Sequence, residues 1–283
     1  MKPKVIAVVG PTASGKTKLA IELAHKYNGE VISADSRLVY KGFDIASAKP
    51  TMEEREGIPH HLIDIVEPEV DYTAGDWMKD AKKAVEDIVS RGKTPIIAGG
   101  TGLYFRVLLE HYNLPEAETN YELRAELEKY SKEELLKKLE IADKKTFDSL
   151  SQDTSKRRII RIFELMDALG KPLSEVNTIK EPEYDTEWIM PEIPSREWLY
   201  DRINKRVDIM YEQGIVEETK LLLEKHGRIP NFTETIGYKE ILAYLDGNWT
   251  LDEALDKLKQ HTRNYAKRQL TWFRKNPNLK VNV

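Results

Sequence analysis

The chain has 283 residues, of which 40% are hydrophobic and 33% charged, and it contains no cysteine. This composition is typical of a sizeable folded core with solvated helices, and it excludes disulfides and thiolate metal sites. No apolar stretch approaches the ~18 residues of a membrane span, and the start of the chain does not resemble a signal peptide. We therefore expect a cytoplasmic protein with no membrane contact.

The first elements predict a phosphate site. Residues 5–9 form a short run rich in β-branched residues, which indicates a buried parallel strand. The next eight residues match the pattern G-x-x-x-x-G-K-[ST], and a helical pattern with Leu19 and Leu23 follows. Backbone N–H groups of such a loop hold phosphates, its lysine adds charge and its threonine hydroxyl binds Mg²⁺. The predicted phosphate-binding residues are Gly10, Pro11, Thr12, Ala13, Ser14, Gly15, Lys16 and Thr17.

Further strands alternate with helices. Residues 30–36, 60–66 and 94–99 read as strands, and residues 73–93 as a long helix that stops at Gly92. This alternation predicts a P-loop NTPase-like α/β fold with a doubly wound parallel sheet. Ligands of such sheets bind at the carboxyl ends of the strands, where residues 10–17, 35–36 and 99–101 would meet.

Acidic residues end two of these strands. A carboxylate at Asp35 would lie close to bound phosphates, so it needs a function: it could reach Mg²⁺ through water or accept a proton from a nucleophile. The alternative is that it caps the next helix. Asp64 could assist Thr17 as a metal partner through water. His60 and His61 point to opposite faces of a strand, which favours packing or hydrogen bonding over metal binding.

The pattern changes to short charged helices after residue 113. Ser131 and Glu134 form a capping box that starts one of them. We expect a first core part at 1–113, a helical insertion at 114–150, and a second core part with a helical carboxyl-terminal region at 151–283. Later in the chain, Arg206 could clamp a pyrophosphate, or it could pair with an aspartate on its own helix surface.

The carboxyl-terminal end is basic although the net charge of the chain is −4. Residues 257–283 contain eight lysines and arginines and no acidic residue. Cations interleave with aromatic residues on one predicted helix, which is the composition of an RNA-binding surface. Tyr265 and Trp272 could equally pack this helix on the core.

Several long motifs in order resemble the tRNA dimethylallyltransferases, also called tRNA isopentenyltransferases. They are GPTASGKT, VISADSRLVYKGFDIASAKP, GIPHHLIDIVEP, PIIAGGTGLYFRVLL, LYDRINKRVDIM, ETIGYKE and YAKRQLTWFRK. The resemblance covers nearly the whole chain. It implies transfer of a dimethylallyl group from dimethylallyl diphosphate to N6 of adenosine 37 in the anticodon stem-loop of tRNAs reading U-initial codons, with Mg²⁺ and as a monomer.

The resemblance also implies roles for single residues. Asp35 matches the general base, Thr101 matches a residue that holds the adenosine, and Arg206 matches the arginine that stabilises the leaving pyrophosphate. Residues at matching positions would contact tRNA: Asp35, Ser36, Arg37, Leu38, Thr101, Arg157, Arg158, Arg161, Gly237, Tyr238 and Lys239. The basic helix adds Arg263, Lys267 and Arg268 to this set.

The chain departs from the family at two places, and other functions remain open. Family members have GTAKP where this chain has ASAKP at residues 46–50, and they have an HPN-type stretch where it has residues 151–154. A P-loop kinase for a small molecule, in which the loop binds ATP, shares the loop and the carboxylate. So does an adenylate isopentenyltransferase acting on free nucleotide. Neither the kinase nor the adenylate isopentenyltransferase requires the basic helix. The intact loop argues against a non-catalytic RNA-binding module.

Overall fold

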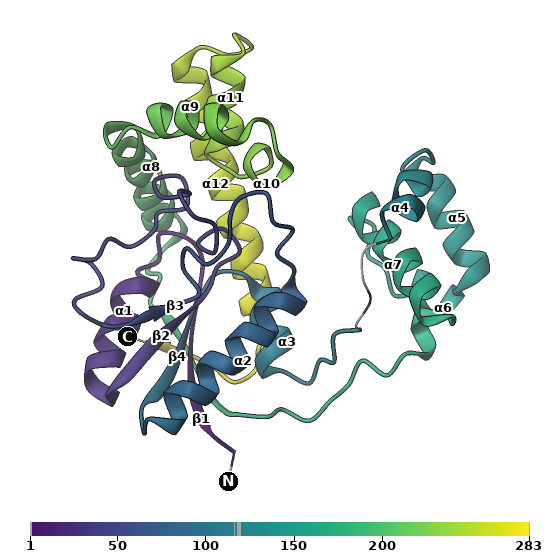
Figure 1. The fold of residues 1–283 in the computed structure, drawn as a ribbon, viewed down its shortest axis with the longest axis horizontal. Coiled ribbons are helices and arrows are strands. Elements are labelled where there is room, and N and C mark those ends of the chain that lie inside the picture. Colours follow the sequence, from purple (N-terminus) through teal and green to yellow (C-terminus); the bar gives the residue numbers. More distant parts are fainter. Residues whose placement is uncertain (1, 116, 118–119, 283) are drawn as a thin grey trace. The chain divides into compact units, whose positions relative to one another are not determined.

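The computed structural model describes residues 2–115, 117 and 120–282. Within these residues, six strands form one parallel sheet in the order β3-β2-β4-β1-β5-β6 (Figure 1). This sheet confirms the predicted α/β fold. The strands are β1 (Lys4–Val9), β2 (Gly29–Ala34), β3 (His60–His61), β4 (Thr94–Gly99), β5 (Asp185–Pro191) and β6 (Leu279–Asn282).

The three strands that carry candidate residues end at one edge of the sheet. Gly99 of β4 pairs with Val9 of β1 on one side and with Ala34 of β2 on the other. The same edge of the sheet therefore carries the phosphate loop after β1, Asp35 after β2 and Thr101 after β4. This register places the predicted residues together, as expected for a parallel sheet.

Two strands differ from the sequence prediction. β3 has two residues instead of about seven, because Leu62 and Asp64 have positive φ angles that an extended strand does not allow. β6 was not predicted, since its residues lie beyond the basic helix in a short polar stretch. It gains its strand conformation by pairing with β5 at the edge of the sheet.

Helices cover both faces of the sheet. Helix α1 (Lys16–Tyr27) packs its Leu19, Ala20 and Ala24 against Ile6 and other alternate strand residues. The intervening strand residues face the opposite side. There α2 (Ala74–Ser90) inserts Trp77, whose Nε1 donates to the Ser33 carbonyl and whose ring stacks on Tyr104 of α3 (Gly102–Leu109). Helix α2 ends just before Gly92, as predicted.

The carboxyl-terminal helices form a second layer above the ligand edge. They are α8 (Arg196–Glu212), α9 (Ile215–His226), α10 (Pro230–Thr233), α11 (Tyr238–Leu245) and α12 (Leu251–Phe273). Val207, Ile215, Ile241 and Leu258 share one apolar cluster that holds α8, α9, α11 and α12 together. The 23-residue helix α12 runs from this cluster to α3, where Phe273 contacts Phe105 edge-on (Figure 1). Helix α12 thus connects the layer of carboxyl-terminal helices to α3.

Residues 111–181 form a separate compact unit. It contains α4 (Tyr121–Leu127), α5 (Lys132–Ala142), α6 (Lys144–Asp148), α7 (Lys156–Leu169) and a 3₁₀ turn at Leu173–Glu175. The insertion is therefore longer than the predicted 114–150. The reason is that α7 packs on its neighbours in this unit, where Ile159, Ile160 and Ile162 join Leu135 and Leu139 in one core. The predicted capping box at Ser131 and Glu134 is present.

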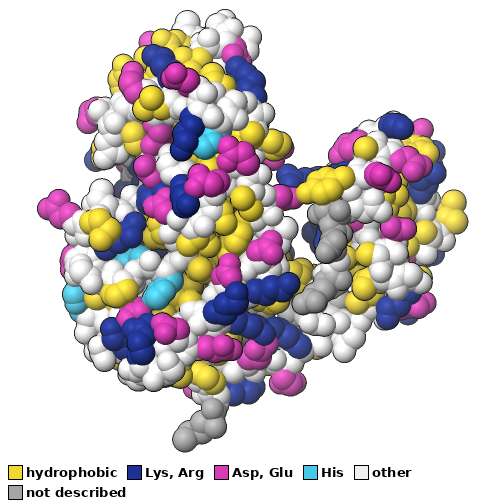
Figure 2. Space-filling view, in the orientation of Figure 1, with side chains coloured by type: hydrophobic (Ala, Val, Ile, Leu, Met, Phe, Trp, Pro, Cys, Tyr) yellow, Lys and Arg dark blue, Asp and Glu magenta, His cyan; other side chains and the backbone are white. Residues whose placement is uncertain are grey.

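Charges of both signs are interspersed on the visible surface. On the face shown in Figure 2, Lys and Arg side chains lie among Asp and Glu side chains, in keeping with the small net charge. Among the helices of the described residues, none combines the length and the apolar character that spanning a bilayer requires.

Candidate active site

The phosphate loop, residues 10–17, joins β1 to α1 in the conformation expected of an anion site. Gly10, Ala13 and Gly15 have positive φ angles, which turn successive backbone N–H groups toward one side. A Cβ on Gly10 would lie 3.1 Å from Ser14 Oγ, so the tight turn also favours glycine. The loop precedes the amino terminus of a 12-residue helix, whose dipole adds to the positive potential.

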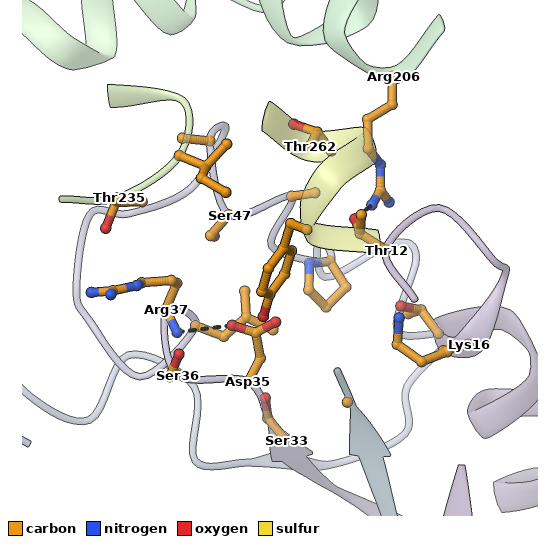
Figure 3. Close-up of a pocket in the computed structure, with 18 of the residues that line it drawn as sticks. Thr12, Lys16, Ser33, Asp35, Ser36, Arg37, Ser47, Arg206, Thr235 and Thr262 are labelled. Carbon is orange, nitrogen blue, oxygen red and sulfur yellow. Dashed lines mark hydrogen bonds between the residues drawn. The ribbon is translucent and has the colours of Figure 1, made fainter. Parts of the chain in front are cut away.

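A cavity of about 400 Å³ opens beside this loop. Its lining comes from elements far apart in the sequence: the loop, the end of β2, and helices α8 and α12 (Figure 3). The size suits a small organic molecule with polar anchors. The lining includes Lys16, Thr17, Asp35, Arg206 and Tyr265.

Two cations face this cavity from the loop side. Lys16 Nζ donates to the Pro11 carbonyl at 2.6 Å. Burial, and then the charge of Arg206, lower the pKa of Lys16 to about 7, while Asp35 partly opposes this shift. Burial also lowers the pKa of Arg206. Arg206 makes the charge of Lys16 less favourable, and Arg202 does the same to Arg206, so this cluster of cations favours an anion beside it.

Arg206 reaches the loop from α8. Its Nη1 donates to Thr12 Oγ1 at 3.1 Å, and the guanidinium points toward Thr12 in Figure 3. One turn earlier, Arg202 Nε donates to the Ala13 carbonyl at 2.8 Å. The alternative of an ion pair on the helix surface is not what the structure shows, since Asp208 pairs with Lys259 at 2.6 Å.

Asp35 lies across the cavity from Lys16 (Figure 3). Its Oδ1 accepts a hydrogen bond from the backbone N–H of Arg37 at 2.8 Å, which closes a turn. No helix begins here, so the alternative role as a helix cap does not apply. The local bond orients the carboxylate into the cavity, where it also influences the charges of Lys16 and Arg206.

Thr101 and Tyr265 flank this carboxylate. Thr101 Oγ1 accepts a hydrogen bond from the N–H of Ser36 at 3.1 Å, which ties the end of β4 to the Asp35 turn. Burial and the charge of Asp35 raise the pKa of Tyr265 to about 12, partly opposed by its hydrogen bond with Thr101. Tyr265 is therefore part of the cavity wall. Trp272, by contrast, packs against Gly102, where a Cβ would lie 2.4 Å from the indole.

The two residues predicted to hold Mg²⁺, Thr17 and Asp64, lie in different surroundings. Thr17 lines the cavity, as do Ser33 and His60, whose Oγ and Nε2 atoms are buried without a hydrogen-bond partner in the described part of the chain. The Thr17 hydroxyl oxygen suits a hydrated Mg²⁺ ion, whereas an imidazole nitrogen such as that of His60 is not a ligand that Mg²⁺ prefers. Asp64 instead forms an ion pair with Lys49, so its carboxylate has a structural role in the loop after β3. Nowhere in residues 2–115, 117 and 120–282 do three or more His, Asp or Glu side chains group to hold a metal.

The two histidines after residue 59 have structural contacts, as predicted. His61 Nε2 lies 2.7 Å from a carboxylate oxygen of Glu30, and His60 Nδ1 lies 2.8 Å from the Ile58 carbonyl. A carbonyl can only accept, so Nδ1 of His60 carries the proton and Nε2 is an acceptor. Burial lowers the pKa of His60, in keeping with a neutral ring.

Ten of the predicted tRNA contacts fall into three groups. Ser36, Arg37, Leu38, Lys239 and Arg268 line the cavity. Lys267 is exposed on α12, and Arg263 on the same helix donates to Asn204 Oδ1 at 2.7 Å. The remaining arginines, Arg157, Arg158 and Arg161, lie on α7 in the separate unit, where Arg161 contacts Glu164 and the Ala117 carbonyl.

The structure places the side chain of Tyr238, which we predicted to be near tRNA, inside the protein. Tyr238 has 0% exposure, and its hydroxyl donates to Glu218 Oε1 at 2.7 Å. Glu218 also accepts from the backbone N–H groups of Ile45 and Ala46. Gly237 is buried as well, and a Cβ there would lie 2.7 Å from the Cβ of Ala46. Gly237 and Tyr238 thus support the loop at residues 44–48, whereas Lys239 of the same segment lines the cavity.

Sequence reasoning missed Gln269, a buried residue of α12 that contacts the phosphate loop. Two signals were available. Thr262, Tyr265 and Gln269 recur at helical spacing on one face, and a second glycine, Gly100, directly follows the last residue of β4. Such a glycine often marks a place where another group approaches the backbone closely.

Comparisons with known proteins find relatives that match nearly the whole chain. Residues 38–276 match the family model described as IPP transferase. A tRNA dimethylallyltransferase of Acetivibrio thermocellus is 46% identical, with 97% of this chain and 90% of the relative aligned. One of Anoxybacillus flavithermus is 44% identical over 97% of this chain and 88% of the relative.

Solved structures show the same likeness. The tRNA isopentenylpyrophosphate transferase of Bacillus halodurans is 42% identical, with a TM-score of 0.74 over 99% of this chain and 90% of that chain. A eukaryotic dimethylallyltransferase acting on tRNA is 33% identical, with a TM-score of 0.81 over 96% and 70% of the two chains. Both the family model and these relatives cover most of the chain, and the chain therefore belongs to the IPP transferase family.

Proposed function

We propose that this protein transfers a dimethylallyl group from dimethylallyl diphosphate to N6 of adenosine 37 in tRNAs that read codons beginning with U. The observation that carries the proposal is the placement of Asp35 across one cavity from Lys16 and Arg206. Family membership supports the tRNA acceptor. The phosphate loop then holds the diphosphate of the prenyl donor in place of ATP.

The cationic side of the cavity suits the departure of pyrophosphate. As the bond between C1 and the diphosphate oxygen breaks, negative charge grows on that oxygen. Lys16 and Arg206 line the cavity and contact the phosphate loop, so together with the loop N–H groups they would stabilise this charge. Mg²⁺, held by the Thr17 hydroxyl, would supply further positive charge on the diphosphate oxygens.

The acidic side suits the nucleophile. The lone pair of the adenine amine is delocalised into the ring, which makes the amine a poor nucleophile. As N6 forms its bond to C1, one amine proton must leave, and the Asp35 carboxylate is placed to accept it. The hydroxyl of Thr101 lies beside Asp35 and Tyr265, where it can hold the adenine in position.

The acceptor base must leave its stack to enter this cavity. Extrusion costs a few kcal/mol, and less for a loop nucleotide than for a paired one. Lys267 and Arg268, exposed on α12, can offset this cost through phosphate contacts. We further propose that the protein acts as a monomer in the cytoplasm.

Mass spectrometry of the product tests the proposal. The full chain is incubated with dimethylallyl diphosphate, Mg²⁺ and unmodified tRNA reading U-initial codons, and the tRNA is digested to nucleosides. One prenyl group on a single adenosine is expected, and none on a tRNA with guanosine at position 37. An unmodified tRNA together with ATP-dependent phosphorylation of a metabolite would refute the proposal in favour of a kinase.

A further inference from the structure

Gln269 joins the phosphate loop to the turn after β4 through its side-chain amide. The residue is 5% exposed on the inner face of α12. Its Oε1 accepts from the backbone N–H of Thr12 in the phosphate loop at 2.9 Å. Its Nε2 donates to the carbonyl of Gly100, directly after β4, at 3.0 Å. The phosphate loop and the β4 turn are thus held from the carboxyl-terminal helix.

The two bonds need an amide of this length. Glutamate can only accept and lysine can only donate, whereas the glutamine amide does both. The position of Gly100 in turn requires glycine, because a Cβ there would lie 2.0 Å from Gln269 Nε2. The backbone of Gly100 is not in the left-handed region, so this approach, and not the chain conformation, explains the glycine.

The hydrogen bond between Gln269 and Thr12 lies where Arg206 and Lys16 contact the phosphate loop. Thr12 is held by Gln269 at its N–H and by Arg206 at its hydroxyl. The neighbouring Pro11 carbonyl accepts from Lys16 Nζ. If the amide were lost, the Thr12 N–H and the Gly100 carbonyl would be left without this partner, and the loop would shift to find another.

We propose that Gln269 is a positioning residue for the diphosphate site: through its amide, α12 holds the phosphate loop in its binding conformation. This inference rests on the proposed function, since it takes the ligand to be the diphosphate of the prenyl donor. Helix α12 then has two roles. Its exposed cations face RNA, and its buried amide shapes the donor site.

Binding of inorganic pyrophosphate with Mg²⁺ to the full chain, measured by titration calorimetry, tests the inference without tRNA or turnover. Gln269→Leu keeps the size of the side chain and removes both bonds. We expect its Kd for pyrophosphate to rise about tenfold, which corresponds to about 1.4 kcal/mol. In steady-state assays the KM for dimethylallyl diphosphate should rise similarly, while the Kd for tRNA stays within about threefold.

Two control variants separate positioning from general damage to α12. Thr271→Ala changes an exposed hydroxyl on the same helix, which donates to the Lys267 carbonyl. Phe273→Leu weakens the docking of α12 on Phe105 of α3 and leaves the phosphate loop untouched. Thermal melting shows how much stability each variant loses. Both controls should bind pyrophosphate within about twofold of the wild type.

The outcomes distinguish the inference from the function on which it rests. Wild-type-like pyrophosphate binding by Gln269→Leu overturns the inference alone. So does a loss in Phe273→Leu as large as that in Gln269→Leu, because helix docking would then explain it. A wild-type chain that does not bind pyrophosphate overturns the diphosphate site and the inference together.

Discussion

The low pKa of Lys16 predicts that binding of the prenyl diphosphate takes up a proton. In the free protein, burial and the charge of Arg206 lower this pKa from the usual 10.5 to about 7. A bound diphosphate places negative charge beside the amine and raises its pKa again. Above pH 7 the amine must therefore be protonated as the ligand binds.

The size of the effect follows from this pKa. At pH 8.5 an amine with a pKa of about 7 is charged in about 3% of molecules. Protonating it costs about 2 kcal/mol, so the affinity should be about thirtyfold weaker than below pH 7. Over the range in which Lys16 is neutral in the free protein, each pH unit should weaken binding about tenfold.

Calorimetry with a non-reactive thio analogue of dimethylallyl diphosphate measures both the affinity and the number of protons taken up. A phosphate ester loses its last proton near pH 6, so the charge of the ligand stays about constant between pH 7.5 and 9.5. Titrations at pH 8.5 in two buffers of different ionisation enthalpy give the number of protons taken up. We expect about one for the wild type.

Lys16→Arg is the matched control. Arginine stays charged throughout this range, so this variant should bind with no proton uptake and with an affinity that does not depend on pH. The reasoning fails if the wild type takes up no proton at pH 8.5. It also fails if Lys16→Arg takes up as many protons as the wild type.

Three further predictions concern other parts of the site. Asp35→Asn should lower the single-turnover rate about 10²- to 10⁴-fold and leave the tRNA Kd within a few-fold, as expected for a base; normal turnover with weak tRNA binding would contradict this role. The affinity for tRNA should fall steeply with salt, and Lys267→Ala or Arg268→Ala should each reduce the slope of log K against log [salt] by about 1; unchanged slopes would remove these residues from the interface. Tyr238→Phe removes the 2.7 Å hydrogen bond to the half-buried Glu218, so melting should show a loss of about 1–2 kcal/mol; a weaker tRNA affinity with unchanged stability would indicate that Tyr238 contacts RNA.

The departure from the family pattern at residues 46–50 has a structural context. Ala46 lies beside Gly237, and its backbone N–H and that of Ile45 donate to the Glu218 carboxylate. Burial raises the pKa of Glu218 in spite of these hydrogen bonds. The loop that lines the cavity is thus held by a partner from α9 that no local pattern around residue 46 indicates.

Local patterns in the sequence were sufficient for the central strands of the sheet and for the phosphate loop. A buried strand, a glycine-rich turn and a helix start are each encoded by neighbouring residues, and parallel strands must end at a common edge. The position of Asp35 near the loop follows from these rules alone. The extent of the insertion does not, because the amphipathic pattern of α7 does not say which core its apolar face joins.

Contacts between distant segments were decided by the tertiary structure. The sequence shows Gln269, Tyr238 and Asp64 as polar residues near candidate motifs, and spacing cannot tell which of them face a ligand. In the folded chain Gln269 bonds the phosphate loop, Tyr238 bonds Glu218 and Asp64 pairs with Lys49. For Gln269 and Tyr238 the physical reason is that a buried polar group must find a partner, and its partner is set by the packing of whole helices and not by its neighbours in the chain.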